Sequence, residues 1–196
     1  MINQSNDSFS VLGDAAYIVA PKLLGSLLER TIDGHLLRVR IVEVEAYDES
    51  DAASHSYRGS TPRTAIMFGP FGFLYVYFTY GMHYCCNIVT GPVDSGAAVL
   101  LRAAEPLVGM EYMSERRHGL EGKSITNGPA KLCQALGIDK QLNGHDLHGE
   151  PLRLILRDPL PQSQIVQTTR IGITQAVEVP WRFYIRDNPF VSKAVG

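Results

Sequence analysis

Two glutamates and a tyrosine alternate along one predicted strand and are the strongest candidates for chemistry. Glu43, Glu45 and Tyr47 stand at every second position, so strand periodicity places them on one face. The same face carries three apolar residues earlier in the strand, namely Leu37, Val39 and Ile41. An apolar face points at the core, which predicts partly desolvated carboxylates, and such a group beside a long loop is a candidate general base. The alternative is that the core face ends at Ile41 and that both glutamates are solvated.

One arginine, Arg102, ends an apolar predicted strand of residues 97–103. A buried guanidinium needs a carboxylate or several carbonyl oxygens as partners. Glu45 is one such partner, and the pair would keep that carboxylate ionised and fixed in direction. Pairing of Arg102 with Glu105, or a purely structural role in a loop, is the open alternative.

Four of the nine tyrosines gather in residues 74–87, around the pair Tyr80-Gly81. Aromatic, β-favouring residues on both sides of a glycine predict a hairpin with a tyrosine at its tip. A ring held out on a turn is a poor core residue, but it stacks well on a nucleobase or fills the gap that an extruded base leaves.

Two further polar clusters carry weaker signals. His145 and His148 lack a third well-spaced ligand, and the glycines around them indicate a surface turn, so we expect no metal site. Asn127-Gly128-Pro129 predicts the start of a short helix that Gly137 ends. Lys131 in its first turn suits a phosphate, although an ordinary capped helix is the alternative. We expect no cofactor.

The elements that must position these residues are mostly strands. Residues 26–32 and 36–47 are predicted strands joined by a tight turn at Asp33-Gly34, and residues 48–70 form a long ordered loop. Asp14 is expected to cap a helix that runs to Leu24. Pro106 is expected to open another helix, to about His118. Further strands are expected at residues 151–157, 165–174 and 180–186.

This order predicts an α+β fold in one compact domain over residues 1–196. We expect a mixed, mainly antiparallel β-sheet with flanking helices and a protruding β-hairpin. No run of residues approaches the ~20 apolar positions that span a bilayer, and the N-terminus has no signal-peptide core. Three cysteines form neither a disulfide framework nor a C-x-x-C pair, which indicates reduced thiols in a cytoplasmic protein.

The charge balance limits how the chain could hold nucleic acid. The net charge is −2, whereas a protein that binds DNA mainly by neutralising phosphates is usually basic. A local basic face is compatible with this balance. Its candidate members are Arg58, Arg63, Arg102, Lys131, Arg170 and Arg182.

Several blocks, in order and over nearly the whole chain, resemble the alkyladenine (3-methyladenine) DNA glycosylase family. They are residues 40–47 (RIVEVEAY), 53–56 (ASHS), 61–63 (TPR) with Met67-Phe68, 74–77 (LYVY), Tyr80-Gly81-Met82, Cys85-Cys86-Asn87, 100–103 (LLRA), 128–136 (GPAKLCQAL), 182–186 (RFYIR) and 188–192 (NPFVS). A single block would be weak, but the ordered set is highly specific.

The resemblance implies a monofunctional enzyme of base excision repair. It would flip an alkylated or deaminated purine, of the 3-methyladenine or hypoxanthine type, out of duplex DNA and hydrolyse the N-glycosidic bond, leaving an abasic site. By position, Glu45 would be the general base that activates water, and Arg102 would place the water and the carboxylate.

The resemblance also implies a base pocket and a DNA surface. Tyr47, His55 and Tyr77 would enclose the flipped purine, and Asn87 on the floor would exclude guanine. Tyr80 would wedge into the duplex and Met67 would press on the neighbouring base pair. Arg63 and Lys131 are expected to contact the DNA backbone. The expected partner is double-stranded DNA with damaged purines, with no membrane, and the expected state is a monomer in the cytoplasm, nucleoid-associated when on DNA.

Two other functions remain open at this point. A non-catalytic nucleic-acid-binding module would use the tyrosine hairpin only for stacking, and would be indifferent to Glu45. Alternatively, the hairpin would pack against a partner protein. Composition alone does not separate these readings, whereas the resemblance favours the enzyme.

Overall fold

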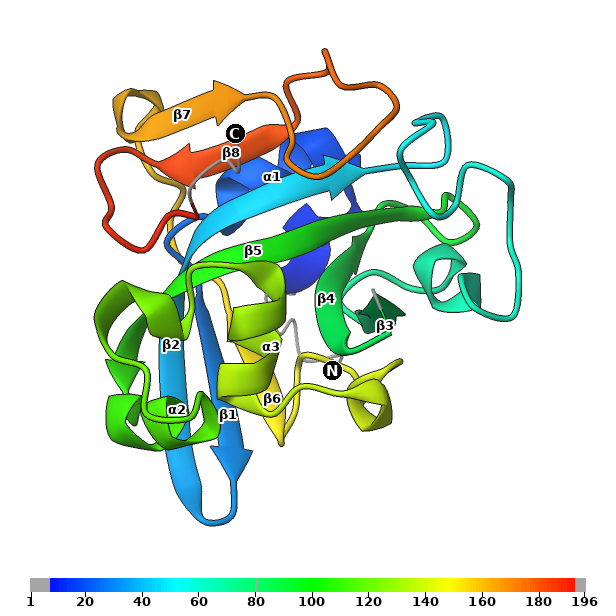
Figure 1. The fold of residues 1–196 in the computed structure, drawn as a ribbon. Coiled ribbons are helices and arrows are strands. Elements are labelled where there is room, and N and C mark those ends of the chain that lie inside the picture. Colours follow the sequence, from blue (N-terminus) through cyan, green and yellow to red (C-terminus); the bar gives the residue numbers. More distant parts are fainter. Residues whose placement is uncertain (1–7, 80, 193–196) are drawn as a thin grey trace, which may run out of the picture.

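The fold is built around one antiparallel sheet of eight strands (Figure 1). The computed structural model describes residues 8–79 and 81–192. Within these ranges the strands are β1 (Leu27–Ile32), β2 (His35–Tyr47), β3 (Leu74–Thr79), β4 (His83–Thr90), β5 (Ala97–Val108), β6 (Leu152–Ile155), β7 (Ile165–Thr168) and β8 (Arg182–Ile185). The α-helices are α1 (Ala16–Leu23), α2 (Met110–Arg116) and α3 (Pro129–Leu136). Short 3-10 helices are η1 (Ser8–Gly13), η2 (Ala65–Phe68), η3 (Gly122–Ile125), η4 (Lys140–Leu142) and η5 (Gln162–Gln164).

Strand β2 is central because it changes partners along one edge. That edge pairs with β1 as far as Arg40 and with β8 from Glu43 to Glu45, while β5 pairs along the other edge. The ladder with β5 shifts register in the interval where the partner changes. A bulge of this kind bends a strand and increases its twist, which curls the sheet. Figure 1 shows β7 and β8 beside the end of β2 that lies away from the β1–β2 turn.

The helices pack on the sheet and close its core. Helix α1 contacts β2 and β5, and α3 contacts β4 and β5. The buried side chains of α3 recur at helical spacing on one face: Leu132, Cys133, Ala135 and Leu136. Pro129 begins this helix and Gly137, at φ +60°, ends it, as the sequence predicts.

Both predicted hairpins are present. Asp33 and Gly34 have φ values of 50° and 79°, which is the two-residue turn that suits the twist of paired strands. Strands β3 and β4 pair as far as Thr79 and His83, and Gly81 and Met82 lie in the turn at the tip of this hairpin. Tyr80 itself lies outside the described residues.

The predicted cap of the first helix is wrong. The residue that precedes α1 is Ala15, and no side chain caps the helix. Asp14 instead pairs with Lys22 on the same helix, with 2.9 Å between the carboxylate oxygen and Nζ. Pro21 lies in the last turn.

The predicted helix start at Pro106 is also wrong. Pro106 lies inside β5 opposite Val39, next to a register shift in the ladder. A residue without an N–H is tolerated there because the ladder is already interrupted. Helix α2 begins only at Met110, after Gly109 turns the chain with a φ of +76°.

The predicted α+β class is confirmed, and every ladder between the described strands is antiparallel. None of the helices within the described ranges is long and apolar enough to cross a membrane.

Candidate active site

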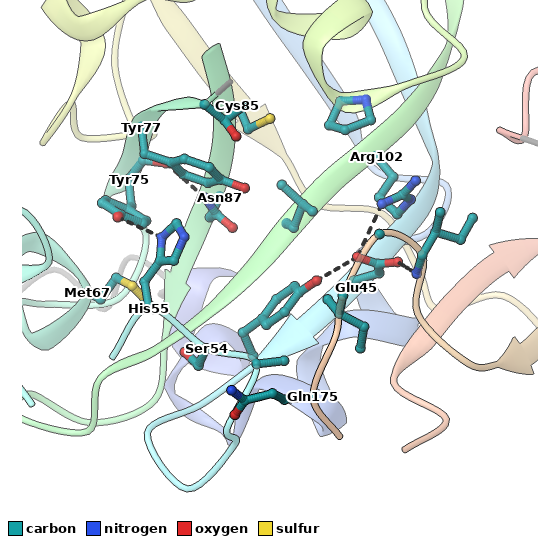
Figure 2. Close-up of a pocket in the computed structure, with 18 of the residues that line it drawn as sticks. Glu45, Ser54, His55, Met67, Tyr75, Tyr77, Cys85, Asn87, Arg102 and Gln175 are labelled. Carbon is teal, nitrogen blue, oxygen red and sulfur yellow. Dashed lines mark hydrogen bonds and ion pairs between the residues drawn. The ribbon is translucent and has the colours of Figure 1, made fainter. Parts of the chain in front are cut away.

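A pocket of about 460 Å³ opens between the β3–β4 hairpin, the end of β2, the first half of β5 and the loop after β7 (Figure 2). Small-molecule sites typically measure about 300–1,000 Å³. Residues far apart in the sequence line it, among them Glu45, Tyr47, His55, Tyr77, Asn87, Arg102 and Ile171. The structure therefore brings together at one cavity the two residues expected to carry the chemistry and the four expected to hold a base.

Glu45 is fully buried in the wall of this pocket, and protein donors take the place of solvent around its carboxylate. Oε1 accepts a hydrogen bond from the backbone N–H of Ile171 at 2.8 Å. Oε2 accepts one from the hydroxyl of Tyr47 at 2.8 Å and one from Nη1 of Arg102 at 3.3 Å. A carboxylate offers about four lone-pair directions, so about one direction is left for a molecule in the pocket.

Glu43 is also fully buried, and four protein donors surround its carboxylate. Oε1 accepts hydrogen bonds from Nε of Arg102 at 3.1 Å, Nε of Arg182 at 2.7 Å and Oγ of Ser192 at 2.8 Å. Oε2 accepts one from the N–H of Ser192 at 2.6 Å. Three of these four donors converge on Oε1 and one on Oε2, and Glu43 does not line the pocket. Of the two carboxylates, Glu45 is the one placed to act on a bound molecule.

The glutamates are desolvated as expected, but not on the predicted face. The core takes Leu37, Val39 and Ile41 and then, after the bulge, Val44 and Ala46. The bulge reverses the alternation because it inserts an extra residue into the strand. Glu43 and Glu45 therefore face Arg102, away from the main core. The prediction that Glu43 and Glu45 share a face with Ile41 is therefore wrong. The alternative, that both glutamates are solvated, is also wrong.

Arg102 pairs with both carboxylates and is 7% exposed. The expected partnership with Glu45 is confirmed, whereas Glu105 pairs with Arg40 instead. Burial acts to lower the pKa of Arg102, but the negative charges of Glu45 and Glu43 outweigh it and raise the pKa. The guanidinium therefore stays charged beside Glu45.

Aromatic rings form the wall opposite Glu45. The rings of Tyr75 and Tyr77 stack with centroids 5.6 Å apart, and His55 meets Tyr77 edge-on at 4.5 Å. Nδ1 of His55 lies 3.0 Å from the hydroxyl oxygen of Tyr75. Figure 2 shows His55 and Tyr77 across the cavity from Glu45. A flat ring entering the pocket would lie between aromatic surfaces.

The aromatic and thiol side chains that line the pocket are held neutral. Burial, followed by the charge of Glu45, raises the pKa of Tyr47, and burial raises the pKa of Tyr77. Both hydroxyls therefore keep their protons at neutral pH. Burial and the nearby charge of Arg63 lower the pKa of His55. Burial raises the pKa of the Cys85 thiol to about 11.

Asn87 and Met67 complete the pocket at the base of the hairpin. Asn87 is 5% exposed, and its Nδ2 donates to the carbonyl oxygen of Tyr75 at 3.1 Å. Met67, expected to press on a base pair, is 3% exposed and packs with Tyr75, because η2 folds against β3 and β4. The structure thus places Met67 in the pocket wall rather than at the surface. Met82, near the turn of the hairpin, is instead 68% exposed.

Only half of the predicted basic face is accessible. Three members are 6–7% exposed and bound to carboxylates: Arg102, Arg170 and Arg182. The prediction that these three arginines belong to an exposed basic face is therefore wrong. Arg58 and Arg63 are exposed, and the guanidinium of Arg63 lies 5.8 Å from the ring centre of Tyr77, a residue of the pocket lining. Lys131 is half-buried, with Nζ donating to Oδ1 of Asn127 at 2.8 Å.

Two features of the site were not predicted from the sequence. Arg170 forms a buried pair with Asp51, and its guanidinium lies 4.7 Å from the ring centre of Tyr47, which it supports from behind. Ile171 supplies the backbone donor to Glu45. Strand β7 ends at Thr168, so the residues predicted as the second half of a longer strand instead form the loop that crosses the pocket. No side-chain pattern marks a backbone N–H.

The histidines at residues 145 and 148 do not converge on one point. Nε2 of His145 lies 2.8 Å from the carbonyl oxygen of Leu152, and Nδ1 of His148 lies 2.7 Å from the carboxylate of Asp146. No three histidine, cysteine or acidic side chains gather as metal ligands in the part of the chain that the structure describes.

Comparison with known proteins gives one consistent result. The model of a family described as methylpurine-DNA glycosylase matches residues 10–189. A protein of Carboxydothermus hydrogenoformans is 50% identical over 177 residues, covering 90% of this chain and 93% of the relative. One of Methanoculleus marisnigri is 50% identical over 184 residues, covering 89% and 92%. One of Francisella tularensis is 47% identical over 177 residues, covering 89% and 92%. All three are provisionally named as 3-methyladenine DNA glycosylases.

Proposed function

The chain belongs to the methylpurine-DNA glycosylase family, and we propose that it releases damaged purines by a water attack for which Glu45 is the general base. Family membership makes it a DNA glycosylase of DNA repair, a hydrolase that acts on N-glycosyl bonds. The products are a free purine and an abasic site in the strand.

The observation that carries the proposal is the environment of Glu45. Three donors fix its carboxylate, and about one lone-pair direction is left for a water molecule. The ion pair with Arg102 fixes Oε2, and the Glu45 carboxylate is thereby placed to accept a proton from that water. Glu43 is as deeply buried, but it does not line the pocket and so cannot present a water to a base bound there.

Burial of Glu45 requires that the base come to the pocket. An atom inside a base-paired stack cannot reach a fully buried carboxylate, so the nucleotide must be extruded. Extrusion costs a few kcal/mol, least where the base is damaged. Tyr47 and Tyr77 offer faces on which the purine would stack, with His55 at its edge.

The aromatic pocket favours a cationic purine. Alkylated purines such as 3-methyladenine carry positive charge, and a desolvated cation–π contact contributes about 2 kcal/mol. A cationic base also leaves without much acid assistance, so one carboxylate suffices where sugar hydrolases use two. Hypoxanthine is neutral, gains less from the rings, and is the slower substrate in this proposal.

The hairpin tip is the proposed duplex-facing element. Phe78 and Met82 are 50% and 68% exposed there, which is unusual for large apolar side chains. We assign to Tyr80, between them in sequence, the role of filling the gap left by the extruded base. We assign the contact with the neighbouring base pair to Met82, because Met67 is buried. Arg63 and Lys131 are assigned to the DNA backbone.

The proposal is tested with duplex DNA treated with a methylating agent, and with a duplex that carries one hypoxanthine. Free 3-methyladenine is separated by chromatography, and abasic sites are counted by alkaline strand cleavage. The expected result is release of 3-methyladenine with one abasic site for each base released, and slower release of hypoxanthine. Tight binding to the same DNA with no abasic product would instead favour the non-catalytic module.

A further inference from the structure

We propose that Glu43 is a positioning residue for the reaction, and that Ser192 holds it in place from near the C-terminus of the chain. The proposal rests on the assigned role of Glu45. Glu43 does not line the pocket, so it acts through Arg102, which it contacts directly. No pattern in the sequence separates the two glutamates, whereas the structure gives them different partners.

The guanidinium of Arg102 is divided among three acceptors. Nε donates to Glu43 at 3.1 Å, Nη1 to Glu45 at 3.3 Å, and Nη2 to Oγ of Ser192 at 3.5 Å. An arginine beside a single carboxylate favours a two-bond fork that engages both carboxylate oxygens. Because Glu43 and Ser192 hold the other two nitrogens, Arg102 presents only Nη1 to Glu45.

This division preserves the direction that Glu45 needs for water. Without Glu43, Arg102 is free to close on Glu45 as a fork and to occupy the remaining lone-pair direction. The charges act in the same sense. Glu43 and Glu45 are matched by Arg102 and Arg182, so a neutral side chain at residue 43 leaves one positive charge in excess beside Glu45.

Ser192 fixes Glu43 from the other side. Its N–H and Oγ donate to the two carboxylate oxygens at 2.6 Å and 2.8 Å, and its carbonyl oxygen accepts from Nη2 of Arg182 at 3.2 Å. Ser192 is 7% exposed, although it lies four residues from the last residue of the sequence. The segment after β8 thus contributes directly to the cluster behind the pocket.

The test compares Glu43→Gln with a matched control, Glu29→Gln. Glu29 is 4% exposed and also bridges two arginines of the sheet, Arg38 and Arg153, but it lies outside the pocket. Single-turnover release of 3-methyladenine is measured at saturating enzyme, together with the Kd for lesion DNA. We expect Glu43→Gln to slow release about tenfold or more, with the Kd changed by no more than about twofold, and Glu29→Gln to keep the rate.

Equal rates in Glu43→Gln and the unmodified chain overturn the proposal, as does an equal loss in both variants. If the unmodified chain releases no base, the proposed function fails instead, and the two failures are thus distinguished.

Ser192→Ala provides a second test that keeps the charge of Glu43, should Glu43→Gln not fold. It removes one donor from Glu43 and one acceptor from Arg102. We expect release to slow about threefold, the effect of one ordinary hydrogen bond. Ser114→Ala is the control. Oγ of Ser114 donates a 2.7 Å hydrogen bond to the carbonyl oxygen of Leu120, and Ser114 does not line the pocket. A Ser192→Ala rate equal to that of the control contradicts the proposal.

Discussion

The two buried glutamates of β2 show how donor geometry assigns different roles to identical side chains. Both are fully buried and both contact Arg102. Glu43 has four donors and does not line the pocket, while Glu45 has three donors and lines it. A buried carboxylate away from the pocket contributes structure, and one that lines the pocket with a lone-pair direction left can bind a water and accept its proton.

Asn87 provides a residue-scale prediction about specificity. Its side chain is fixed by the carbonyl of Tyr75 at the floor of the pocket, where it would meet the exocyclic amino group of a guanine. We expect Asn87→Ser to raise the release of 3-methylguanine relative to 3-methyladenine about tenfold, since one misfitting group in a pocket contributes about 1–3 kcal/mol.

The ratio of the two free bases is measured by chromatography from methylated DNA. Asn143→Ser is the control, because Asn143 accepts from the backbone N–H of Val76 and does not line the pocket. An unchanged ratio in Asn87→Ser would remove Asn87 from the specificity account.

Glu29 provides a residue-scale prediction about stability. Burial acts to raise the pKa of Glu29, but Arg153 and Arg38 outweigh it and lower the pKa below its usual 4.5. A carboxyl with a lowered folded-state pKa contributes stability that is present above 4.5 and lost as the pH falls through the folded-state pKa. We expect Glu29→Gln to lower the free energy of unfolding by about 1 kcal/mol at pH 7, with the difference shrinking below pH 4.5.

Urea unfolding of both chains across this pH range measures the difference. A difference that stays constant down to the acid limit would show that the charge of Glu29 is not its source.

At the scale of the elements, local sequence signals were sufficient where the structure depends on local chemistry. The turn at Asp33-Gly34 and the helix between Pro129 and Gly137 were predicted because backbone conformation decides them. The bulge near Glu43 was not, because a register shift depends on the strand opposite. The predicted helix start at Pro106 failed for the same reason, because the place of Pro106 in β5 depends on the interrupted ladder with β2.

In the site, too, the residues on strands were predicted, whereas their long-range partners were not. Glu45, Arg102, Tyr47 and Tyr77 lie on strands, and the residues expected at the pocket are found there. The site is supported by long-range contacts. Arg170 pairs with Asp51, and the backbone N–H groups of Ile171 and Ser192 donate to Glu45 and Glu43 respectively. These partners are separated by 119–149 positions in the chain, so no spacing rule could connect them.

The junction between β5 and α2 provides an element-scale prediction. Gly109 has a φ of +76°, and a Cβ there would lie 2.5 Å from Leu37 and 2.8 Å from the carbonyl oxygen of Leu36. Gly119 has a similar φ of +79° and open space around it. We expect Gly119→Ala to cost about 1 kcal/mol from the backbone alone, and Gly109→Ala to cost about 2 kcal/mol more from the added overlap.

Urea midpoints of the two variants, read against the unmodified chain, provide the comparison. Equal losses in the two variants would mean that the β5–α2 junction yields to the methyl group, contrary to the close packing seen there.

At the scale of the whole molecule, electrostatics should contribute little to DNA binding. The net charge is −2, and three of the six candidate cationic side chains are buried in ion pairs. The remaining candidates are Arg58, Arg63 and Lys131. Since each neutralised phosphate contributes about −0.9 to the slope of log K against log salt concentration, we expect a slope no steeper than about −3.

Fluorescence anisotropy with lesion duplex from 50 to 300 mM salt, roughly the range where such slopes are read, measures this quantity. Arg63→Ala should make the slope shallower by about 0.9. A slope of about −6 or steeper would require cationic contacts that the exposed candidates do not provide.

The central claim, that Glu45 activates the water, is tested most directly by single-turnover base release from methylated duplex DNA by Glu45→Gln. Glutamine keeps the size of the side chain but cannot accept the proton, so we expect the rate to fall by about 10²–10⁴-fold while lesion DNA is still bound. Glu105→Gln, which alters a carboxylate of the same sheet paired with Arg40 outside the pocket, should keep its rate. Near-full activity in Glu45→Gln would contradict the account.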